Sequence, residues 1–475
     1  MTAEPSLAPI DLDRIARDLR LGTAESRRPI GLARVEIGRD ALDGLAGIVA
    51  SVRRAGPVVI LSDRTPKQRL GHELTAIVCE RLAALGPELV LLGADGSELH
   101  ADPAALDRAT VAVANAGCVV AVGSGTVCDL GKEATNQASG GHDPAPYVVV
   151  QTACSVNAFS DDMAVVLLHG VKRTIPSRWV DALVIDLGVI ADAPPRLNQS
   201  GVGELVSMFT APADWRLANA LGMGTPYDGE VVALFRDGGP RLLSLGAGVA
   251  ARDATALRDL SVLMTHSGLA LGIAGQSAPI SGAEHTIGHL LDMAAAAHGT
   301  TTGLHGSQVG VAAIVAAVVW RRVLATLDPE RLAAAAPPAD AVHARIDRSF
   351  GPLDASGAMA AECWADCERK LARWQSSFAV RRAAADDWPS LRAELEALVA
   401  DPSRIAETLR AAGAPTRFSE LDPPVEAVTA RWSVSSAHLM RERFTVLDLA
   451  SFALDADERF FEDVLEECAA LGAGL

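Results

Sequence analysis

The 475-residue sequence has no long apolar run, no paired cysteines and no excess of positive charge. No apolar stretch reaches the roughly 18 to 20 residues needed to span a bilayer. The first twenty residues also lack the apolar segment of a signal peptide. We therefore expect a cytoplasmic protein that does not interact with membranes.

The seven cysteines are scattered along the chain and form no CxxC pair. An odd number without paired spacing favours reduced thiols over disulfides or a structural zinc site. Cys363 and Cys367 share one predicted helix face, and we interpret them as core residues.

The formal net charge of -17 argues against a nucleic-acid partner. It leaves a small anionic substrate possible, because nearby charges dominate inside a pocket and distant charges are screened.

Short aliphatic runs alternate with helical stretches from about residue 28 to residue 192. The predicted strands occupy residues 57–63, 88–94, 118–125, 146–153 and 181–187, with helices predicted at 66–86 and 102–117. This alternation predicts an α/β domain with a parallel sheet, covered by helices on both faces. Residues 1–27 are interpreted as a polar or helical lead-in.

After residue 193, Ala- and Leu-rich helical patterns continue to the C-terminus. One clear example is residues 253–275, which end on a glycine, a residue typical of helix ends. The sequence therefore predicts two domains, a Rossmann-like domain at 28–192 and an all-helical domain at 193–475.

A glycine-rich turn carrying Gly123, Ser124, Gly125 and Thr126 follows the predicted strand at 118–125. Glycines let a phosphate approach the backbone, and a helix N-terminus favours its negative charge. A dinucleotide pyrophosphate fits this pattern, although the match is neither a full GxGxxG nor a Walker A motif. A plain tight turn remains an equal alternative.

Asp63 ends another predicted strand, where a carboxylate can bind a ribose diol and repel a 2'-phosphate. Arg64 beside it could reverse that preference. The cofactor is therefore expected to be NAD or NADP, with a lean towards NAD.

Three histidines lie within 21 residues of a chain that contains only 11. His285 and His289 are four residues apart on a predicted helix, and His305 precedes another helical run. Catalytic metals usually take three protein ligands and leave one position open. A carboxylate from elsewhere in the helical domain is the expected third ligand.

Seven stretches of the chain carry a family resemblance: GSGTVCDLGK, QTACSVNAFSDD, GVKRTIPSR, the stretch from DLGVIADAPP to ADWRLANALG, SGAEHTIGH, LHGSQVGVA and LMRERFTVLDLA. In their order and spacing, from about residue 30 to about residue 455, the chain resembles the sn-glycerol-1-phosphate dehydrogenases, especially their bacterial branch. That branch belongs to the superfamily of glycerol dehydrogenase, the iron-containing alcohol dehydrogenases and dehydroquinate synthase.

The resemblance implies a metal site formed by Glu204, His285 and His305, with His289 facing the substrate. The metal would be one divalent ion, zinc or nickel, with iron the less favoured choice. It also implies that Asn157 contacts the substrate. The residues that correspond to the cofactor-binding positions are Gly123, Ser124, Gly125, Thr126, Asp129, Thr152, Ser155 and Asp161.

Lys172 and Arg173 suit an anionic substrate group, both by charge and by resemblance. A surface β-turn is the competing interpretation of this pair.

Three positions depart from the glycerol-1-phosphate dehydrogenase pattern. The acidic ligand in that family is aspartate, whereas this chain has Glu204, and Met208 replaces a lysine four residues later. Asp161 stands where the family often has serine, and a carboxylate there would repel a pyrophosphate unless it points away. Dehydroquinate synthase has glutamate at the ligand position, so Glu204 remains compatible with a metal.

These features predict a metal-dependent NAD(P)-linked oxidoreductase that acts on a small phosphorylated polyol or its ketone. Glycerol 1-phosphate and dihydroxyacetone phosphate are the default pair. One alternative is a dehydroquinate-synthase-like cyclase or lyase with tightly bound NAD, and another is a catalytically silent binding subunit. We expect a homodimer.

Overall fold

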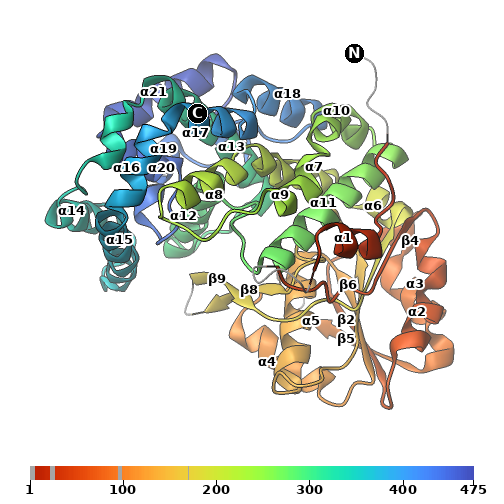
Figure 1. The fold of residues 1–475 in the computed structure, drawn as a ribbon. Coiled ribbons are helices and arrows are strands. Elements are labelled where there is room, and N and C mark those ends of the chain that lie inside the picture. The colour runs from red at the N-terminus through yellow and green to blue at the C-terminus, as the bar shows by residue number, and fades with distance from the viewer. Residues whose placement is uncertain (1–5, 22–26, 95–98, 169–170) are drawn as a thin grey trace. The chain divides into compact units, whose positions relative to one another are not determined.

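The computed structural model describes residues 6–21, 27–94, 99–168 and 171–475 (Figure 1). By internal contacts the chain divides into two compact units. Unit 1 contains Met1–Val202 and Ala233–Gln276, and unit 2 contains Gly203–Val232 and Ser277–Leu475. The predicted domain boundary after residue 192 stays a prediction. Residues 1–5 and 22–26 of the predicted lead-in lie outside the described residues.

Unit 1 is built on a six-stranded parallel sheet in the order β1-β10-β7-β6-β2-β5. All five strands predicted from the sequence are present. Their bounds are β2 Val58–Asp63, β5 Pro87–Leu92, β6 Cys118–Gly123, β7 Tyr147–Gln151 and β10 Ala182–Asp186. The sixth strand, β1 (Arg34–Gly38), is an edge strand without a fully buried run, so the sequence did not reveal it.

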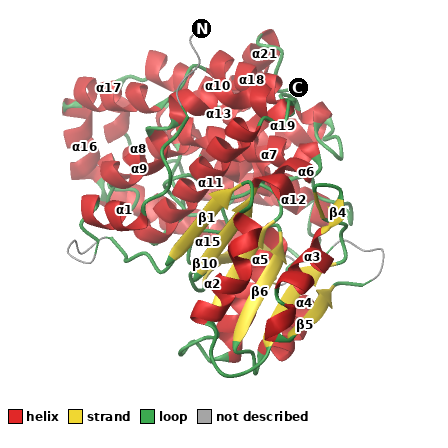
Figure 2. Ribbon diagram, turned by 90° about the vertical axis from the view of Figure 1, so that its right-hand side faces the viewer, coloured by secondary structure: helices red, strands yellow, loops and turns green. Residues whose placement is uncertain are grey.

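Helices cover both faces of this sheet, as Figure 2 shows. Alternate strand residues such as Val58, Ile60 and Val120 form one core with α2 (Leu45–Val52) and α3 (Leu74–Arg81). Helices α4 (Pro103–Val113) and α5 (Gly125–Ala138) also pack on the sheet. Because both faces are covered, the central strands are continuous apolar runs.

The predicted helix at 66–86 is wrong in its first half. Residues 68–73 form a small antiparallel pair, β3 (Gln68–Arg69) and β4 (His72–Glu73). Leu70 and Gly71 between them both have positive φ, which a helix does not allow. The helix begins only after Glu73, whose carboxylate accepts hydrogen bonds from the N–H groups of Thr75 and Ala76.

The predicted helix at 253–275 is confirmed as α11 (Ala254–Ala274), which belongs to unit 1. The Asp253 side chain caps its start, and Gly275 ends it in the left-handed conformation with φ 64°. The other unit 1 elements are α1 Leu12–Asp18, η1 Ala41–Gly44, η2 Ala83–Leu85, β8 Met163–Leu168, β9 Val171–Pro176, α6 Leu187–Asp192, α7 Pro195–Leu205 (which ends inside unit 2) and α10 Gly239–Ala250.

The described secondary-structure elements of unit 2 are α-helices and short 3-10 helices. Helix α13 (His305–Thr326) contacts α12 (Ala283–Ala297), α18 (Pro402–Ala412), α20 (Val446–Ala453) and α21 (Glu458–Ala470). The remaining elements are η3 Val206–Phe209, α8 Ala211–Ala220, α9 Gly229–Arg236 (which ends inside unit 1), η4 Pro329–Ala333, α14 Ala339–Phe350, α15 Ala358–Ser376, α16 Phe378–Asp386, α17 Trp388–Leu398, η5 Phe418–Glu420, α19 Ala427–Ser436 and η6 Ala437–Leu439.

Helix α13 is long and apolar enough, by length and composition, to cross a membrane. This corrects the sequence-based statement that no stretch reaches that length. However, 78% of its apolar window is buried inside the protein. A buried position explains the composition, because a helix that is apolar all round fits the core of a large protein as well as a bilayer.

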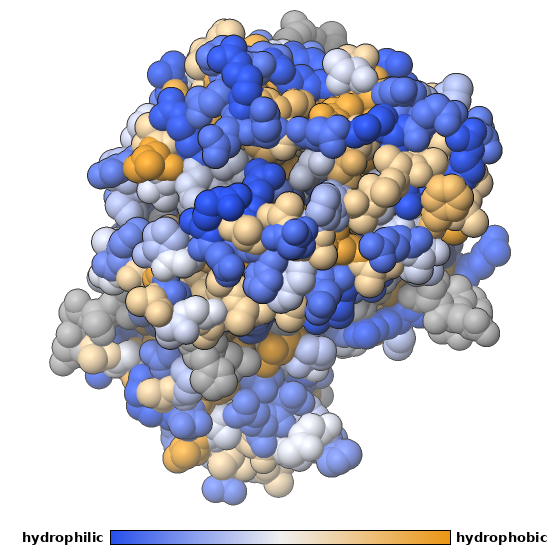
Figure 3. Space-filling model, turned by 90° about the vertical axis from the view of Figure 1, so that its left-hand side faces the viewer, coloured by the Kyte–Doolittle hydropathy of each residue, from blue (hydrophilic) through white to orange (hydrophobic). Residues whose placement is uncertain are grey.

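A parallel-sheet region followed by a mostly helical region confirms the predicted fold class. Figure 3 shows one face of the molecule, where apolar side chains lie in small separate patches among hydrophilic ones. Such scattered apolar residues are ordinary on protein surfaces.

Candidate functional site

The three predicted metal ligands converge inside unit 2. Glu204 lies in the last turn of α7, His285 lies in the first turn of α12, and His305 is the first residue of α13. One ligand atom from each residue lies within 4.8 Å of those of the other two. Glu204 is therefore a neighbour of two residues that follow it by 81 and 101 positions in the chain.

Glycines bring the end of α7 against α13. A Cβ added to Gly203 would lie only 2.1 Å from the carbonyl oxygen of Gly306. A Cβ added to Gly310 would lie 2.9 Å from the Cα of Gly203. Only glycine permits this backbone approach. It places Glu204, the next residue, beside the start of α13.

The distances between the ligand atoms are close to those around a small tetrahedral ion. The Nε2 of His285 lies 3.5 Å from Oε1 of Glu204, and the Nε2 of His305 lies 3.8 Å from Oε2. Ligands about 2.0 to 2.2 Å from a tetrahedral metal are roughly 3.3 to 3.6 Å apart. Among the described residues, the buried Oε2 of Glu204 has no hydrogen-bond partner. The donor set therefore fits a divalent metal.

The charges of the cluster favour an anionic Glu204. Burial raises the pKa of this carboxyl, but the hydrogen bond with His285 and the charges of the two histidines lower it below its usual value. Burial lowers the pKa of His285, while Glu204 and Glu284 raise it to about 9. A divalent cation could replace the histidine proton as the charge that balances Glu204.

His289 adjoins the cluster without belonging to it. Its ring centroid lies 5.5 Å from that of His305 and 6.5 Å from that of His285. It is partly exposed, and it is absent from the group of possible ligands. Its predicted role facing the substrate stays a prediction.

The predicted phosphate-binding turn joins β6 to α5 in unit 1. Ser124 is the N-cap of α5, but its side chain makes no capping hydrogen bond. Its hydroxyl lies 2.9 Å from that of Ser155, so the turn contacts the second predicted cofactor stretch. Thr152 also donates its N–H to the carbonyl of Gly123. The Ser124 side chain therefore leaves the first N–H groups of α5 uncapped, and no other described side chain caps them, as phosphate binding requires.

The glycines of this turn fill tight positions. A Cβ on Gly123 would lie 2.4 Å from Val127, and a Cβ on Gly125 would lie 2.8 Å from Val156. Thr126 follows in the first turn of α5. A side chain at either glycine would therefore force the turn to change.

Asp161 and Asp129 flank a buried lysine. The ammonium of Lys132 lies 2.7 Å from Asp161 and 3.3 Å from Asp129, and its side chain is fully buried. Asp161 also accepts the N–H of Met163, and Asp129 accepts that of Val165. The carboxylate of Asp161 thus shares the ammonium of Lys132 with Asp129, and this ion pair reduces the repulsion expected between Asp161 and a pyrophosphate.

Asp63 lies at the C-terminal end of β2, as predicted. Its carboxylate forms an ion pair with Lys67 and accepts a hydrogen bond from the Thr65 hydroxyl. A role in ribose binding stays a prediction and would require one of these partners to share the carboxylate.

The predicted substrate residues of unit 1 occupy three kinds of position. The side-chain nitrogen of Asn157 is buried and has no hydrogen-bond partner among the described residues. Arg173 is exposed on β9, opposite Val166 on β8. Lys172 pairs with Leu167 in the same hairpin, but its side chain lies outside the described part of the chain. The pair is therefore in a strand and not in a β-turn.

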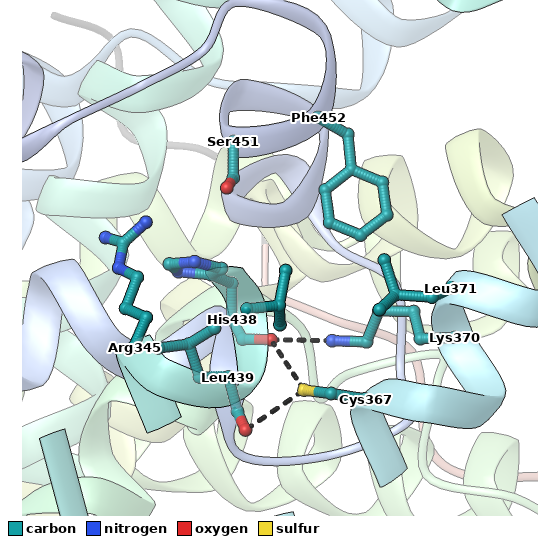
Figure 4. Close-up of a pocket in the computed structure, with 9 residues that line it drawn as sticks. Arg345, Cys367, Lys370, Leu371, His438, Leu439, Ser451 and Phe452 are labelled. Atoms are coloured by element: carbon teal, nitrogen blue, oxygen red, sulfur yellow. Dashed lines mark hydrogen bonds between the residues drawn. The ribbon is translucent and has the colours of Figure 1, made fainter. Parts of the chain in front are cut away.

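A small cavity lies elsewhere in unit 2 (Figure 4). Lys370 and Cys367 donate to the backbone carbonyl of His438, and Cys367 also donates to that of Leu439. Both ring nitrogens of His438 lack hydrogen-bond partners among the described residues. The other residues lining the cavity are Val342, Arg345, Leu371, Ser451 and Phe452. None of the predicted site residues lines it.

Comparisons with known proteins agree with the sequence resemblance. The family model for iron-containing alcohol dehydrogenases matches residues 36–194. A glycerol-1-phosphate dehydrogenase [NAD(P)+] from Bacillus licheniformis is 27% identical over 424 residues, which cover 89% of each chain. One from Pyrococcus furiosus is 31% identical over 212 residues, or 44% of this chain and 58% of the relative.

These matches support the assignment of this chain to the iron-containing alcohol dehydrogenase superfamily. Solved structures agree on the fold. A probable glycerol dehydrogenase from Sinorhizobium meliloti has a TM-score of 0.57 at 18% identity and covers 94% of this chain and 99% of its own. Glycerol dehydrogenase from Schizosaccharomyces pombe has a TM-score of 0.54 at 15% identity, with 92% of each chain covered. The predicted resemblance to the superfamily is confirmed.

Sequence reasoning missed two buried charged residues beside the predicted ones. Lys132 lies in the motif GSGTVCDLGK and Glu284 in the motif SGAEHTIGH, but the sequence analysis predicted no function for either residue. Their position on the apolar face of a helix could have revealed them, because a charged residue is rarely buried without a partner. Glu284 directly precedes His285 and contacts it.

Proposed function

We propose that this protein is a metal-dependent NAD(P)-linked oxidoreductase that interconverts a small phosphorylated polyol and its ketone. The observation that carries the proposal is the cluster of Glu204, His285 and His305, in a chain whose relatives are named glycerol-1-phosphate dehydrogenases. Glycerol 1-phosphate and dihydroxyacetone phosphate are the default substrate pair.

The metal and the nicotinamide supply chemistry that side chains lack. When bound, the metal provides Lewis acidity and NAD(P) donates or accepts the hydride. Glu204, His285 and His305 would hold the ion. Two imidazoles and one carboxylate suit zinc or nickel, and they also allow iron.

The remaining predicted residues would bind and orient the reactants. The turn at Gly123–Thr126, with Asp129, Thr152, Ser155 and Asp161, would hold the dinucleotide, and Asp63 would contact its ribose. Asn157 would donate a hydrogen bond to the substrate, since its buried nitrogen lacks a partner among the described residues. Lys172 and Arg173 would attract its phosphate.

His289 would exchange a proton with the substrate oxygen. An imidazole has an ordinary pKa near neutrality, which suits proton transfer in both directions of the reaction. Its partial exposure gives a route for that proton to solvent.

The experiment is steady-state oxidation of NADH and NADPH with dihydroxyacetone phosphate, before and after addition of zinc or nickel. We expect metal-dependent turnover that a chelator abolishes. Unphosphorylated dihydroxyacetone is the matched control, and equal rates on both ketones would contradict a phosphate-binding pocket.

A second pair of variants tests the departures from the dehydrogenase motif. Glu204→Asp and Met208→Lys restore the residues of glycerol-1-phosphate dehydrogenases. Their combination should raise the rate on dihydroxyacetone phosphate if that is the substrate. No gain would indicate that the pocket serves another compound.

A cyclase or lyase of the dehydroquinate synthase kind is the second candidate, because that enzyme has glutamate at the position of Glu204. It would release phosphate from its substrate without net oxidation of NADH. Steady oxidation of NADH by a ketone would exclude it.

A silent binding subunit is the third candidate, motivated by Met208 and Asp161. Absence of a stoichiometric transition metal, before and after reconstitution, would favour it over both enzymes. We further propose that the protein is cytoplasmic and has no nucleic-acid or membrane partner. We also propose that it forms a homodimer, which light scattering of the purified protein can test.

A further inference from the structure

Glu284 is a fully buried carboxylate that directly precedes a proposed metal ligand. Its Oε1 accepts the backbone N–H of Gly282 at 2.6 Å and lies 2.9 Å from Nδ1 of His285. Its Oε2 accepts the hydroxyl of Thr210 at 2.7 Å. Three polar groups thus converge on one carboxylate at the start of α12.

These contacts hold Glu284 in place from several elements. Gly282 precedes α12, and Thr210 lies between η3 and α8. Buried Asp214, on α8, accepts the backbone N–H groups of Ala283 and Val446 and so ties α8 to the start of α12 and to α20. Hydrogen bonds from the protein itself therefore fix the orientation of Glu284.

The negative charge of this region is balanced locally. Arg443 is buried, and its guanidinium interacts electrostatically with Glu284 and Asp214. It donates hydrogen bonds to the carbonyl of Ser281 and the hydroxyl of Ser277, next to the same helix start. Arg443 lies in the LMRERFTVLDLA motif, and none of the three predicted metal ligands lies in that motif.

Oε1 of Glu284 accepts the N–H of Gly282, so it acts as an acceptor towards Nδ1 of His285 as well. This contact therefore places a proton on Nδ1. The opposite nitrogen, Nε2, is the atom that lies 3.5 Å from Glu204. A neutral imidazole protonated at Nδ1 has its lone pair on Nε2, which is the arrangement that a metal ligand needs.

We propose that Glu284 is a positioning residue that fixes the ring orientation and tautomer of His285, so that Nε2 is presented to the metal. This proposal rests on the metal site of the proposed function. Partners of this kind typically change metal affinity by about 10 to 100-fold when they are mutated.

The test measures zinc affinity of the full-length protein by chelator competition. Glu284→Gln removes the charge with little change in size, and we expect its Kd for zinc to rise by about 10 to 100-fold. Asp292→Asn is the matched control, because it removes a buried carboxylate from the same helix, seven residues after His285. Its Kd should stay within threefold of wild type.

Nitrogen-15 NMR of the zinc-bound wild type provides a second readout that is independent of the Glu284→Gln variant. With labelled histidine, and with His285→Gln to assign the signal, His285 should show a protonated Nδ1 and a metal-bound Nε2. Metal on Nδ1 would overturn the proposal, as would a Glu284→Gln Kd within twofold of wild type. An equal effect of Asp292→Asn would also overturn it, because charge alone would then explain the loss.

Failure of the metal site itself gives a different result. If the wild type took up no zinc, nickel or iron, the proposed function would fall and the role of Glu284 would fall with it. If the wild type bound zinc but the tests above failed, the metal site would stand without Glu284.

Discussion

Replacing Gly203 by alanine should push α7 away from α13 and so separate the proposed metal ligands. The size of this shift follows from the packing of the two helices. The added Cβ would lie 2.1 Å from the carbonyl oxygen of Gly306, whereas ordinary contact begins at 3.4 Å. The difference requires a backbone shift of about 1.3 Å. Metal sites tolerate changes of only about 0.2 Å in ligand distance. We therefore expect the Gly203→Ala protein to lose tight metal binding.

Gly310 and Gly288, which also lie near the proposed metal site, should show smaller effects of an added Cβ. At Gly310 the Cβ would lie 2.9 Å from the Cα of Gly203, so the required shift is about 0.5 Å. At Gly288, on α12, the Cβ would meet the side chain of Gln308 at 3.6 Å, which requires no shift. Gly288→Ala should keep the metal, and it should stabilise the helix by up to about 1 kcal/mol.

The assay is zinc content after reconstitution, followed by chelator competition and urea unfolding of each variant. Overpacking at Gly203 should also cost about 1 to 3 kcal/mol of unfolding free energy. The affinity should fall in the order Gly288→Ala, Gly310→Ala, Gly203→Ala. The reasoning is refuted if a folded Gly203→Ala protein binds zinc as tightly as Gly288→Ala.

Three further predictions concern other parts of the chain. His305→Ala should abolish metal retention in elemental analysis, whereas His289→Ala should keep the metal and lose NADH oxidation; equal metal loss would contradict the role given to His289. Lys132→Met should lower the unfolding free energy in urea by about 3 to 5 kcal/mol, because it leaves buried carboxylates unpaired, and adding Asp161→Asn should recover part of that loss. Burial, with the positive charges near the cavity of Figure 4, holds the pKa of His438 well below its usual value of 6.5. Below pH 6.5 the unfolded chain binds a proton at His438 that the folded protein excludes, so this residue alone should lower the unfolding free energy by about 1.4 kcal/mol for each pH unit of acidification. His438→Phe should remove that slope between pH 6.5 and 5, and an unchanged slope would count against a neutral buried imidazole.

The sheet was largely predictable because its central strands are buried on both faces and appear as short aliphatic runs. The edge strand β1 and strand β9 lack such runs, whereas the apolar run of β8, MAVVLL, is present and was overlooked. The turn at Leu70 and Gly71 interrupts a sequence with helical character. Local patterns therefore predicted the interior of unit 1 better than its margins.

The metal cluster was only partly predictable. The spacing of His285 and His305 indicated ligands, but nothing local connects them to Glu204, which precedes them by 80 residues or more. That pairing came from the resemblance. The contact that creates it depends on Gly203 and Gly310, and on a close packing of two helices that no periodicity reveals.

Helix α13 has a consequence for experiments on this protein. When unit 2 unfolds, 22 residues with the composition of a membrane span become exposed to water. Apolar surface exposed in this way makes unfolded chains prone to associate with one another. Heating should therefore produce aggregates. The unfolding free energies of the variants are best measured in denaturant at low protein concentration.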